Sequence, residues 1–334
     1  MRNPLSKTIE QIKPSGIRKF FDIVSEMPHA ISLGVGEPDF DTPWHVRSEG
    51  IRSLEKGRTF YTSNSGLIEL RQEICKWYQR KYNVLYDYKT EALLTVGGSE
   101  GIDVALRAML DPGDEVIIPE PCYVSYVPCV QLIGAVPVTI ELKNENQFRL
   151  TSEELLAAIT DKTKILILAF PSNPTGAVMT KEDLEPIAKI CQEKDIYVIS
   201  DEIYSELTYG GQKHCSISSL PGMKERTIVI NGFSKAYAMT GWRLGYALAP
   251  EVIAHQMTKI HQFAIMCAPT TSQYAAIEAI KNGDADIEKM CKSYDQRRRF
   301  LLKKFEEIGL PCFEPHGAFY VFPCIKEFGI TSDE

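Results

Sequence analysis

The chain has 334 residues, of which 44% are hydrophobic, and its formal net charge of -7 comes from 37 basic and 44 acidic residues. Because a single core stops growing near ~250–300 residues, this length predicts one large domain and a smaller one. The acidic balance argues against general affinity for nucleic acid or for an anionic membrane surface, so an anionic small ligand needs a local site.

The nine cysteines follow no metal-type spacing and include no Cys-x-x-Cys pair. The sequence therefore predicts neither a zinc site nor a disulfide framework, and a reducing compartment fits best. Residues 1–14 lack the apolar centre of a signal peptide, and no apolar run reaches 18 residues. We expect a soluble protein of the cytoplasm, with no metal and with no nucleic-acid or membrane partner.

Short apolar runs bounded by turn residues predict strands that are buried on both faces. These runs span residues 115–119, 165–170, 196–200, 227–231 and 244–249, and a further strand ends at residues 94–96. If these strands lie parallel in one sheet, a crossover connection must join each strand to the next.

Helical spacing of apolar residues lies between several of these runs, at 102–110, 155–159 and 184–191. Two of the helices begin with a capping pair, Thr151 with Glu154 and Thr180 with Asp183. Alternating strands and helices predict an α/β fold with a mostly parallel, doubly wound sheet. Ligands of such sheets bind beyond the carboxyl ends of the strands.

The first such junction is a glycine-rich turn, Gly97-Gly98-Ser99-Glu100-Gly101, between a strand and a helix. Free backbone amides at a helix start can hold a phosphate. The spacing matches neither a P-loop nor a dinucleotide fingerprint, and an ordinary glycine-rich turn is the other interpretation. A second junction, at 169–176, carries Asn173, whose amide can donate to a ligand oxygen or simply shape an Asn-Pro turn.

The third junction places Asp201 at the end of an apolar strand, with Tyr204 three residues later. An aspartate here can keep a pyridine nitrogen protonated, and a tyrosine can donate to the ring's phenolic oxygen. The alternatives are a helix N-cap for the aspartate and a packing role for the tyrosine.

The fourth junction, residues 231–246, holds Lys235 among small and apolar residues, with Arg243 eight residues later. A lone lysine is usually a solvated surface charge, but this setting desolvates the amine and lowers its pKa. Such an amine condenses with an aldehyde, and the forked donors of an arginine suit a phosphate. The pair predicts a site for a phosphorylated aldehyde, pyridoxal phosphate (PLP).

Taken together, these junctions resemble the class I/II, PLP-dependent aminotransferases of fold type I, over essentially the whole chain. The resemblance rests on segments that occur in the family's order: 15–20, 32–40, 61–66, 173–176, 201–204, 234–243 and 317–320. It implies a large domain with a mostly parallel seven-stranded sheet flanked by helices, and a smaller α+β domain. Residues 1–44 are expected to form an N-terminal arm and part of the small domain, 45–287 the large domain, and 288–334 the rest of the small domain.

The resemblance also implies roles for individual residues. Lys235 resembles the Schiff-base lysine, Asp201 the partner of the pyridine nitrogen, and Tyr204 the donor to the ring oxygen. The other implied positions are Asn173 at the ring oxygen and the substrate, Gly98, Ser99, Ser234 and Arg243 at the phosphate, Tyr123 stacked on the ring, and Gly36 at the substrate carboxylate. Tyr61 resembles a residue that reaches the phosphate of the neighbouring subunit, which implies a homodimer.

Two departures from the family pattern stand out. Gly232 replaces a serine that many relatives have three residues before the lysine, and Ser234 is at best a partial substitute. Relatives continue for several dozen residues beyond 317–320 and carry there an arginine that clamps the substrate carboxylate, whereas this sequence ends at Glu334. Since a bidentate arginine–carboxylate contact is strong, we expect a shortened enzyme with impaired turnover.

The predicted function is transfer of an amino group from an L-amino acid to a 2-oxo acid by ping-pong steps. The sequence resembles bacterial aminotransferases acting on aspartate, aromatic amino acids or N-acetyl-diaminopimelate, and it favours none of the three. Alternatives are a PLP-dependent carbon–sulfur lyase and a module that holds the cofactor with little activity. A nicotinamide oxidoreductase is disfavoured because the glycine fingerprint is missing.

Overall fold

The computed structural model describes residues 2–14, 27, 29, 34 and 36–330. At its centre lies a seven-stranded sheet in the order β1-β7-β6-β5-β4-β2-β3. The strands are β1 (Ala92–Thr95), β2 (Glu115–Glu120), β3 (Val136–Glu141), β4 (Thr163–Ala169), β5 (Tyr197–Asp201), β6 (Thr227–Gly232) and β7 (Gly245–Leu248). Among these seven strands, only β7 runs antiparallel, pairing with both β1 and β6. The predicted α/β fold with a mostly parallel sheet is confirmed.

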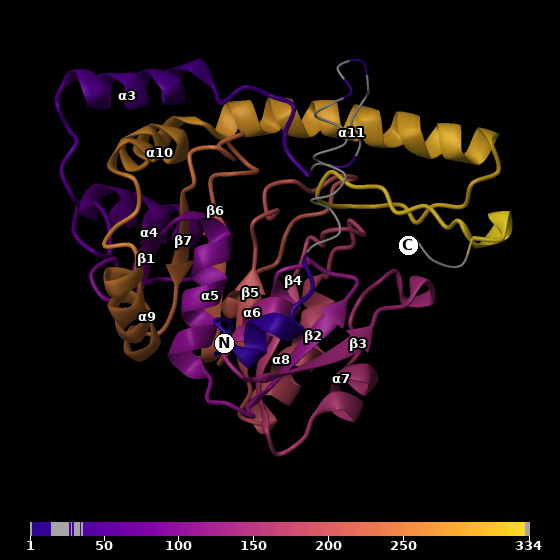
Figure 1. Cartoon of the computed structure of the whole chain (residues 1–334). Helices are drawn as coiled ribbons and strands as arrows, with labels where there is room; N and C mark the ends of the chain where they lie inside the picture. Colours follow the sequence, from indigo (N-terminus) through magenta and orange to yellow (C-terminus); the bar gives the residue numbers. More distant parts are fainter. Residues whose placement is uncertain (1, 15–26, 28, 30–33, 35, 331–334) are drawn as a thin grey trace.

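Helices cover both faces of this sheet (Figure 1). One face carries α5 (Gly97–Met109), α6 (Tyr126–Leu132) and α9 (Glu251–Ala264). The other carries α4 (Ile68–Tyr82), α7 (Ser152–Ala158), α8 (Lys181–Glu193) and α10 (Thr270–Asn282). The other helices among the described residues are α1 (Lys7–Gln11), α3 (Trp44–Glu55), α11 (Asp284–Glu307) and the short 3-10 turns η1 (Asn144–Asn146), η2 (Ile217–Ser219), η3 (Lys224–Arg226) and η4 (Lys326–Phe328).

The strand β4 shows why continuous apolar runs indicate this architecture. Its successive side chains point to opposite faces, so Ile165 and Ile167 join the core under α5 while Leu166 and Leu168 join the core under α8. All four are nearly or fully buried. Both predicted capping boxes are also present, at Thr151 of α7 and Thr180 of α8.

The described part of the chain contains no helix that combines the length and the apolar character needed to cross a membrane. The long helix α11 instead extends along the top of the molecule in Figure 1, together with α3. The helix α3 packs against α10.

One histidine ties these upper helices together. His45 of α3 lies between two carboxylates, with Nδ1 at 2.8 Å from Glu278 of α10 and Nε2 at 2.9 Å from Asp286 of α11. Burial opposes protonation of the ring, but the hydrogen bonds and charges of Asp286 and Glu278 outweigh it, so the pKa of His45 is raised. The ring therefore stays protonated in the folded state at pH values where an exposed histidine loses its proton.

We expect this clamp to stabilise the protein fully below pH 6.5 and to weaken as the pH rises through the raised pKa of His45. Because the side chain is 35% exposed, solvent screening keeps the effect modest. His45→Gln should lower the melting temperature by roughly 1–2 °C at pH 6 and by less at pH 9. A melting difference that grows with pH would contradict the assignment.

Candidate functional site

The candidate site lies where the strands β4, β5 and β6 end and the helix α5 begins. Asp201 ends β5, and Lys235 follows β6 by three residues. The helix α5 begins at Gly97, and the single residue Val96 separates it from the end of β1. Because β1, β7, β6 and β5 are neighbours in the sheet, its topology brings these three segments of sequence together.

Lys235 carries the most perturbed amine of the site. Its Nζ donates a hydrogen bond to the backbone oxygen of Gly36 at 2.5 Å and lies 5.7 Å from the ring centre of Tyr204. Burial lowers the pKa of Lys235 to about 8; Glu37 opposes that change and Arg243 adds to it. An ordinary lysine would be only about 0.3% neutral at pH 8, whereas roughly half of the Lys235 amines are free to attack a carbonyl carbon.

Asp201 is buried and held by two donors. Tyr126 of α6 donates its O–H to Oδ2 at 2.8 Å, and the backbone N–H of Ile203 donates to Oδ1 at 3.2 Å. Burial raises the pKa of Asp201, and the two hydrogen bonds act in the opposite direction. A buried carboxylate of this kind gains most from a cationic partner.

Tyr126 is a residue that the sequence did not predict. Its side chain is almost fully buried, and its pKa lies well above the usual range because of burial and the neighbouring Asp201. The only signal was its place three residues after Tyr123, which puts both rings on one side of the segment leading into α6. The two rings meet edge to face at 5.6 Å.

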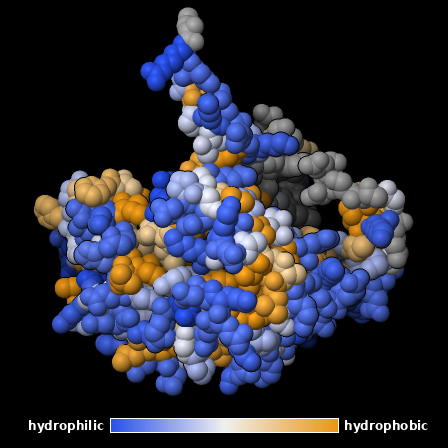
Figure 2. Space-filling view, turned by 90° about the horizontal axis from the view of Figure 1, so that it is seen from below, coloured by the Kyte–Doolittle hydropathy of each residue, from blue (hydrophilic) through white to orange (hydrophobic). Residues whose placement is uncertain are grey.

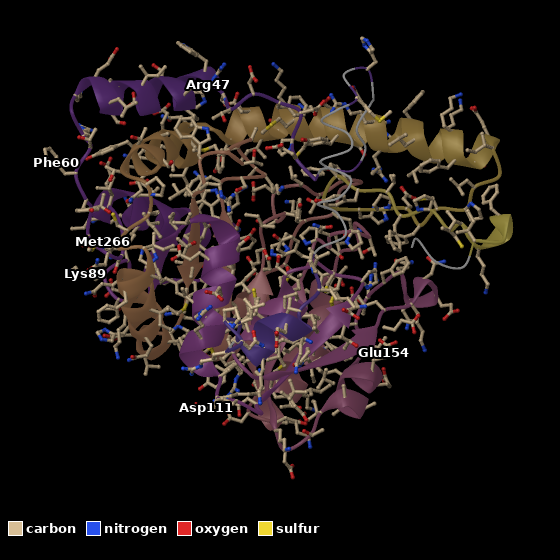
Figure 3. The ribbon with its side chains drawn as sticks, viewed as in Figure 1. Arg47, Phe60, Lys89, Asp111, Glu154 and Met266 are labelled. Carbon is tan, nitrogen blue, oxygen red and sulfur yellow. The ribbon has the colours of Figure 1, made fainter. Side chains whose placement is uncertain are left out.

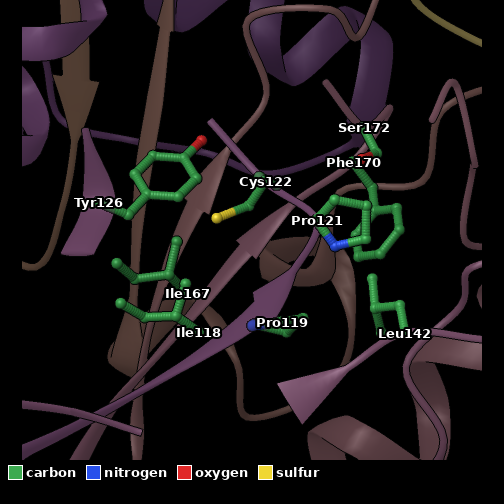
Figure 4. Close-up of a pocket in the computed structure, with 10 residues that line it drawn as sticks. Ile118, Pro119, Pro121, Cys122, Tyr126, Leu142, Ile167, Phe170 and Ser172 are labelled. Carbon is green, nitrogen blue, oxygen red and sulfur yellow. The ribbon is translucent and has the colours of Figure 1, made fainter. Parts of the chain in front are cut away.

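A small cavity adjoins Tyr126 on the sheet side (Figure 4). It measures about 10 Å³ and is lined by residues of β2 and β4 and by the turns that follow them, including Cys122, Phe170 and Ser172. That volume admits at most one water molecule. Burial raises the pKa of Cys122 to about 12, so its thiol is inert at neutral pH.

Tyr204 is buried against the lysine and pairs with a second tyrosine. Its hydroxyl oxygen lies 2.6 Å from that of Tyr320, and its ring packs edge to face on Phe319. Burial raises the pKa of Tyr204 well above the ordinary value. Tyr320 belongs to a segment that carries the family resemblance, but no pattern in the sequence indicates a role for it.

The glycine turn that begins α5 faces Arg243. Gly97 has φ of +73°, a left-handed conformation that disfavours other residues. A Cβ there would lie 2.5 Å from Nη2 of Arg243, so any larger residue at position 97 would displace the guanidinium. The first backbone N–H groups of a helix have no partner within it, and this turn therefore presents amides beside a cation.

For several other residues that the sequence predicts at the site, the structure gives mainly their degree of burial. Asn173 is half-buried in the turn after β4, Ser234 is buried, and Ser99 is exposed on the first turn of α5. Tyr61 is 81% exposed. The segment 15–20 and most of 32–35 lie outside the described residues.

Comparison with known proteins agrees with this geometry. The family model described as aminotransferase class I and II matches residues 28–328. The chain belongs to this family. The aminotransferase is 52% identical to YugH of Bacillus subtilis over 334 residues, which cover 100% of the chain and 86% of that protein. It is 46% identical over 332 residues to an aspartate aminotransferase of Pyrococcus abyssi, with 99% and 85% covered.

Among solved structures, the aminotransferase resembles aspartate aminotransferase from Thermus thermophilus with maleate. The TM-score is 0.93 at 37% sequence identity, and the match covers 98% of this chain and 86% of that one. Enzymes of this family use pyridoxal 5'-phosphate. The aminotransferase is therefore an enzyme that transfers amino groups, with PLP as its cofactor.

The described residues fit this cofactor. The amine of Lys235 suits an aldehyde, the buried carboxylate of Asp201 suits a protonated pyridine nitrogen, and the turn at Gly97 under Arg243 suits a phosphate. The three features differ in chemistry and match three separate groups of one molecule.

Proposed function

We propose that Lys235 is the residue that binds PLP covalently, and that the enzyme moves the amino group of an L-amino acid to a 2-oxo acid by ping-pong steps. The observation that carries this proposal is the lowered pKa of a buried lysine whose amine is affected by the charges of both Asp201 and Arg243. Such an amine is nucleophilic near neutral pH, and its neighbours are the partners that a phosphorylated pyridine ring requires.

The other proposed roles are those that the family resemblance implies. Asp201 would hold the ring nitrogen, while Tyr204 and Asn173 would donate to the ring oxygen, and Tyr123 would stack on the ring. Arg243 and the amides of the α5 turn would hold the phosphate, helped by the side chains of Ser99 and Ser234 and by Gly98. Gly36 would border the substrate carboxylate.

When bound, PLP supplies an electron-accepting ring that stabilises the charge left by removal of the substrate's alpha proton. The chain's own part is to move that proton. Nζ of Lys235, whose pKa burial lowers to about 8, would be suited to take the proton from the alpha carbon. Asp201 would keep the ring nitrogen protonated during this step, and Tyr204 would keep a hydrogen bond on the ring oxygen.

We further propose that the enzyme is a homodimer in which Tyr61 reaches the phosphate of the partner copy. Tyr61 and Phe60 are about 80% exposed, and Phe263 and Met266 lie exposed nearby on the chain's surface. The side chain of Asn64 donates to the backbone oxygen of Met266 at 2.8 Å, which joins the two segments. Phe60 projects from the left side of Figure 3, with Met266 below it.

Large exposed apolar side chains in one region favour an interface. In Figure 2, hydrophobic patches interrupt the hydrophilic surface, some of them on the left side, where α4 and α9 lie in Figure 1. The proposed interface lies on this side of the molecule. A homodimer would cover these side chains.

The substrate class and the compartment complete the proposal. Relatives named for aspartate, aromatic amino acids and N-acetyl-LL-diaminopimelate make these three groups the first amino donors to test. We propose a cytoplasmic location, as the sequence predicts, because all nine cysteines are free thiols and a reducing compartment preserves them.

An absorbance spectrum of the purified protein loaded with PLP tests this function directly. We expect a visible band that disappears with one class of amino donor and returns when a 2-oxo acid is added. The panel should contain aspartate, phenylalanine, tyrosine and N-acetyl-diaminopimelate. Release of pyruvate, ammonia and homocysteine from cystathionine, with no response to 2-oxo acids, would replace transamination by a lyase activity.

A second test concerns the phosphate. Gly97→Ala and Gly113→Ala both put a side chain at a left-handed position, with φ of +73° and +94°, but only Gly97 has an atom within 4 Å of the added Cβ. Both variants should lose about 1 kcal/mol of stability. Only Gly97→Ala, which displaces Arg243, should also weaken PLP affinity, by about tenfold or more. Equal affinities in the two variants, measured by PLP titration, would remove Arg243 from the phosphate site.

A further inference from the structure

The hydroxyl of Tyr320 lies where three parts of the site meet. It is 2.6 Å from the hydroxyl of Tyr204, and it touches Gly36, whose backbone oxygen accepts the hydrogen bond from Lys235. Tyr320 therefore contacts both of the groups that flank the reactive amine.

The backbone that carries Tyr320 is firmly anchored. The N–H groups of His316 and Gly317 both donate to the backbone oxygen of Gly176, at 3.0 and 2.9 Å, and Ala318 donates to that of Leu207 at 2.9 Å. Gly176 lies in the turn that holds Asn173. Because the anchors come from the turns after β4 and β5, the position of the Tyr320 hydroxyl is set by the same framework that sets the site.

Gly36 shows how closely this hydroxyl is packed. A Cβ on Gly36 would lie 2.1 Å from the Tyr320 hydroxyl oxygen, and 3.0 and 3.1 Å from the nearest ring carbons. The first distance is impossible for a side chain, whereas the other two are only tight. The hydroxyl of Tyr320 is therefore enough to require glycine at position 36, before any substrate is considered.

The direction of the hydrogen bond between the two tyrosines matters for the chemistry. One hydroxyl must donate and the other accept, since a single proton lies between oxygens 2.6 Å apart. If Tyr320 donates, the O–H of Tyr204 stays free for a ligand oxygen. If Tyr204 donates to Tyr320, its O–H cannot also donate to a ligand oxygen.

We propose that Tyr320 is a positioning residue that donates to Tyr204, so that the O–H of Tyr204 points toward the ring oxygen of the cofactor while the same hydroxyl keeps Gly36 against Lys235. This inference rests on the proposed role of Tyr204 as a donor to that oxygen. Tyr320 acts through Tyr204 and Gly36 and is assigned no contact with PLP.

Tyr320→Phe removes the donor and keeps the ring. In the PLP-loaded protein, the ring oxygen should then lose part of its hydrogen bond from Tyr204 and hold a shared proton more tightly. We expect the pH at which the visible band changes wavelength to rise by roughly 0.5–1 unit. Tyr294→Phe is the matched control, because Tyr294 packs on Phe319 in the same cluster and its hydroxyl has no hydrogen-bond partner among the described residues.

A double-mutant cycle tests the contact with Gly36 without cofactor. Gly36→Ala should lower the melting temperature clearly in the wild-type background and by less than half as much in Tyr320→Phe, because only the hydroxyl collides with the new Cβ. Equal losses in the two backgrounds would overturn the packing argument. This measurement also shows whether Tyr320→Phe is folded.

The outcomes separate the two proposals. A wild-type protein with no visible band would refute the proposed function and leave the packing result standing. A wild-type band whose pH response is the same in Tyr320→Phe and Tyr294→Phe would overturn the role of Tyr320 and leave the proposed function intact. A shift confined to Tyr320→Phe supports the inference.

Discussion

Lys235→Ala is expected to abolish covalent attachment of PLP and to reduce transamination by about 10⁴-fold or more. The side chain serves twice in the proposed function, as the amine that binds the aldehyde and as the base that moves the substrate's alpha proton, and proton transfer alone is worth about 10²- to 10⁴-fold. Borohydride reduction followed by peptide mass analysis measures the attachment, and single-turnover conversion of an amino acid measures the proton transfer.

Lys259→Ala provides the matched control, since it removes an exposed lysine of α9. It should leave both measurements unchanged. In the wild type, the rate of covalent attachment should rise between pH 7 and 9 with a midpoint near the pKa of about 8 that burial gives Lys235, because only the neutral amine attacks. A borohydride label on another lysine would disprove the assignment.

Much of the fold could be predicted because it follows from local patterns. The strands β4, β5 and β6 are buried on both faces, so their sequences are continuous apolar runs. The strand β3 was not among the predicted runs for a physical reason. It lies at the edge of the sheet, Ile140 is its one buried residue, and it contains Pro137, which an edge strand tolerates.

The candidate site could be predicted only where a single residue carried its own signal. Lys235 has small and apolar neighbours in sequence, and they correctly indicated a desolvated amine. Tyr126 and Tyr320 act through contacts with Asp201 and Tyr204 that lie 75 and 116 residues away in sequence. Periodicity and spacing in the sequence give no information about such long-range contacts. A buried tyrosine is interpreted as a packing residue until the hydrogen-bond partner of its hydroxyl is known.

The effect of Glu37 on Lys235 could not be predicted either, because these two residues are also far apart in the sequence. Its carboxylate accepts a hydrogen bond from Thr240 and favours the charged form of Lys235. A segment of sequence nearly 200 residues before the lysine thus tunes its amine. Burial remains the larger influence on the pKa, which is why the prediction made from local composition had the right sign.

Asp201→Asn is expected to lower turnover by about 10²- to 10⁴-fold while leaving PLP attached to Lys235. Removing one partner of a buried charge pair costs about 3–5 kcal/mol, and each 1.36 kcal/mol is tenfold in rate if the pair is needed at the transition state. Asparagine keeps the size of the side chain, and its amide oxygen can still accept from Tyr126, so the fold around β5 should survive. What is lost is the charge that keeps the pyridine nitrogen protonated.

Asp161→Asn, which neutralises an exposed aspartate before β4, controls for the loss of one negative charge. The half-reaction with the best amino donor should be followed by absorbance in both variants, together with PLP affinity. Since Arg243, Lys235 and the α5 turn are untouched, affinity should change by less than about tenfold. Turnover of Asp201→Asn within threefold of the wild type would mean that the buried carboxylate has a structural role, held by Tyr126, and that the ring nitrogen finds its partner elsewhere.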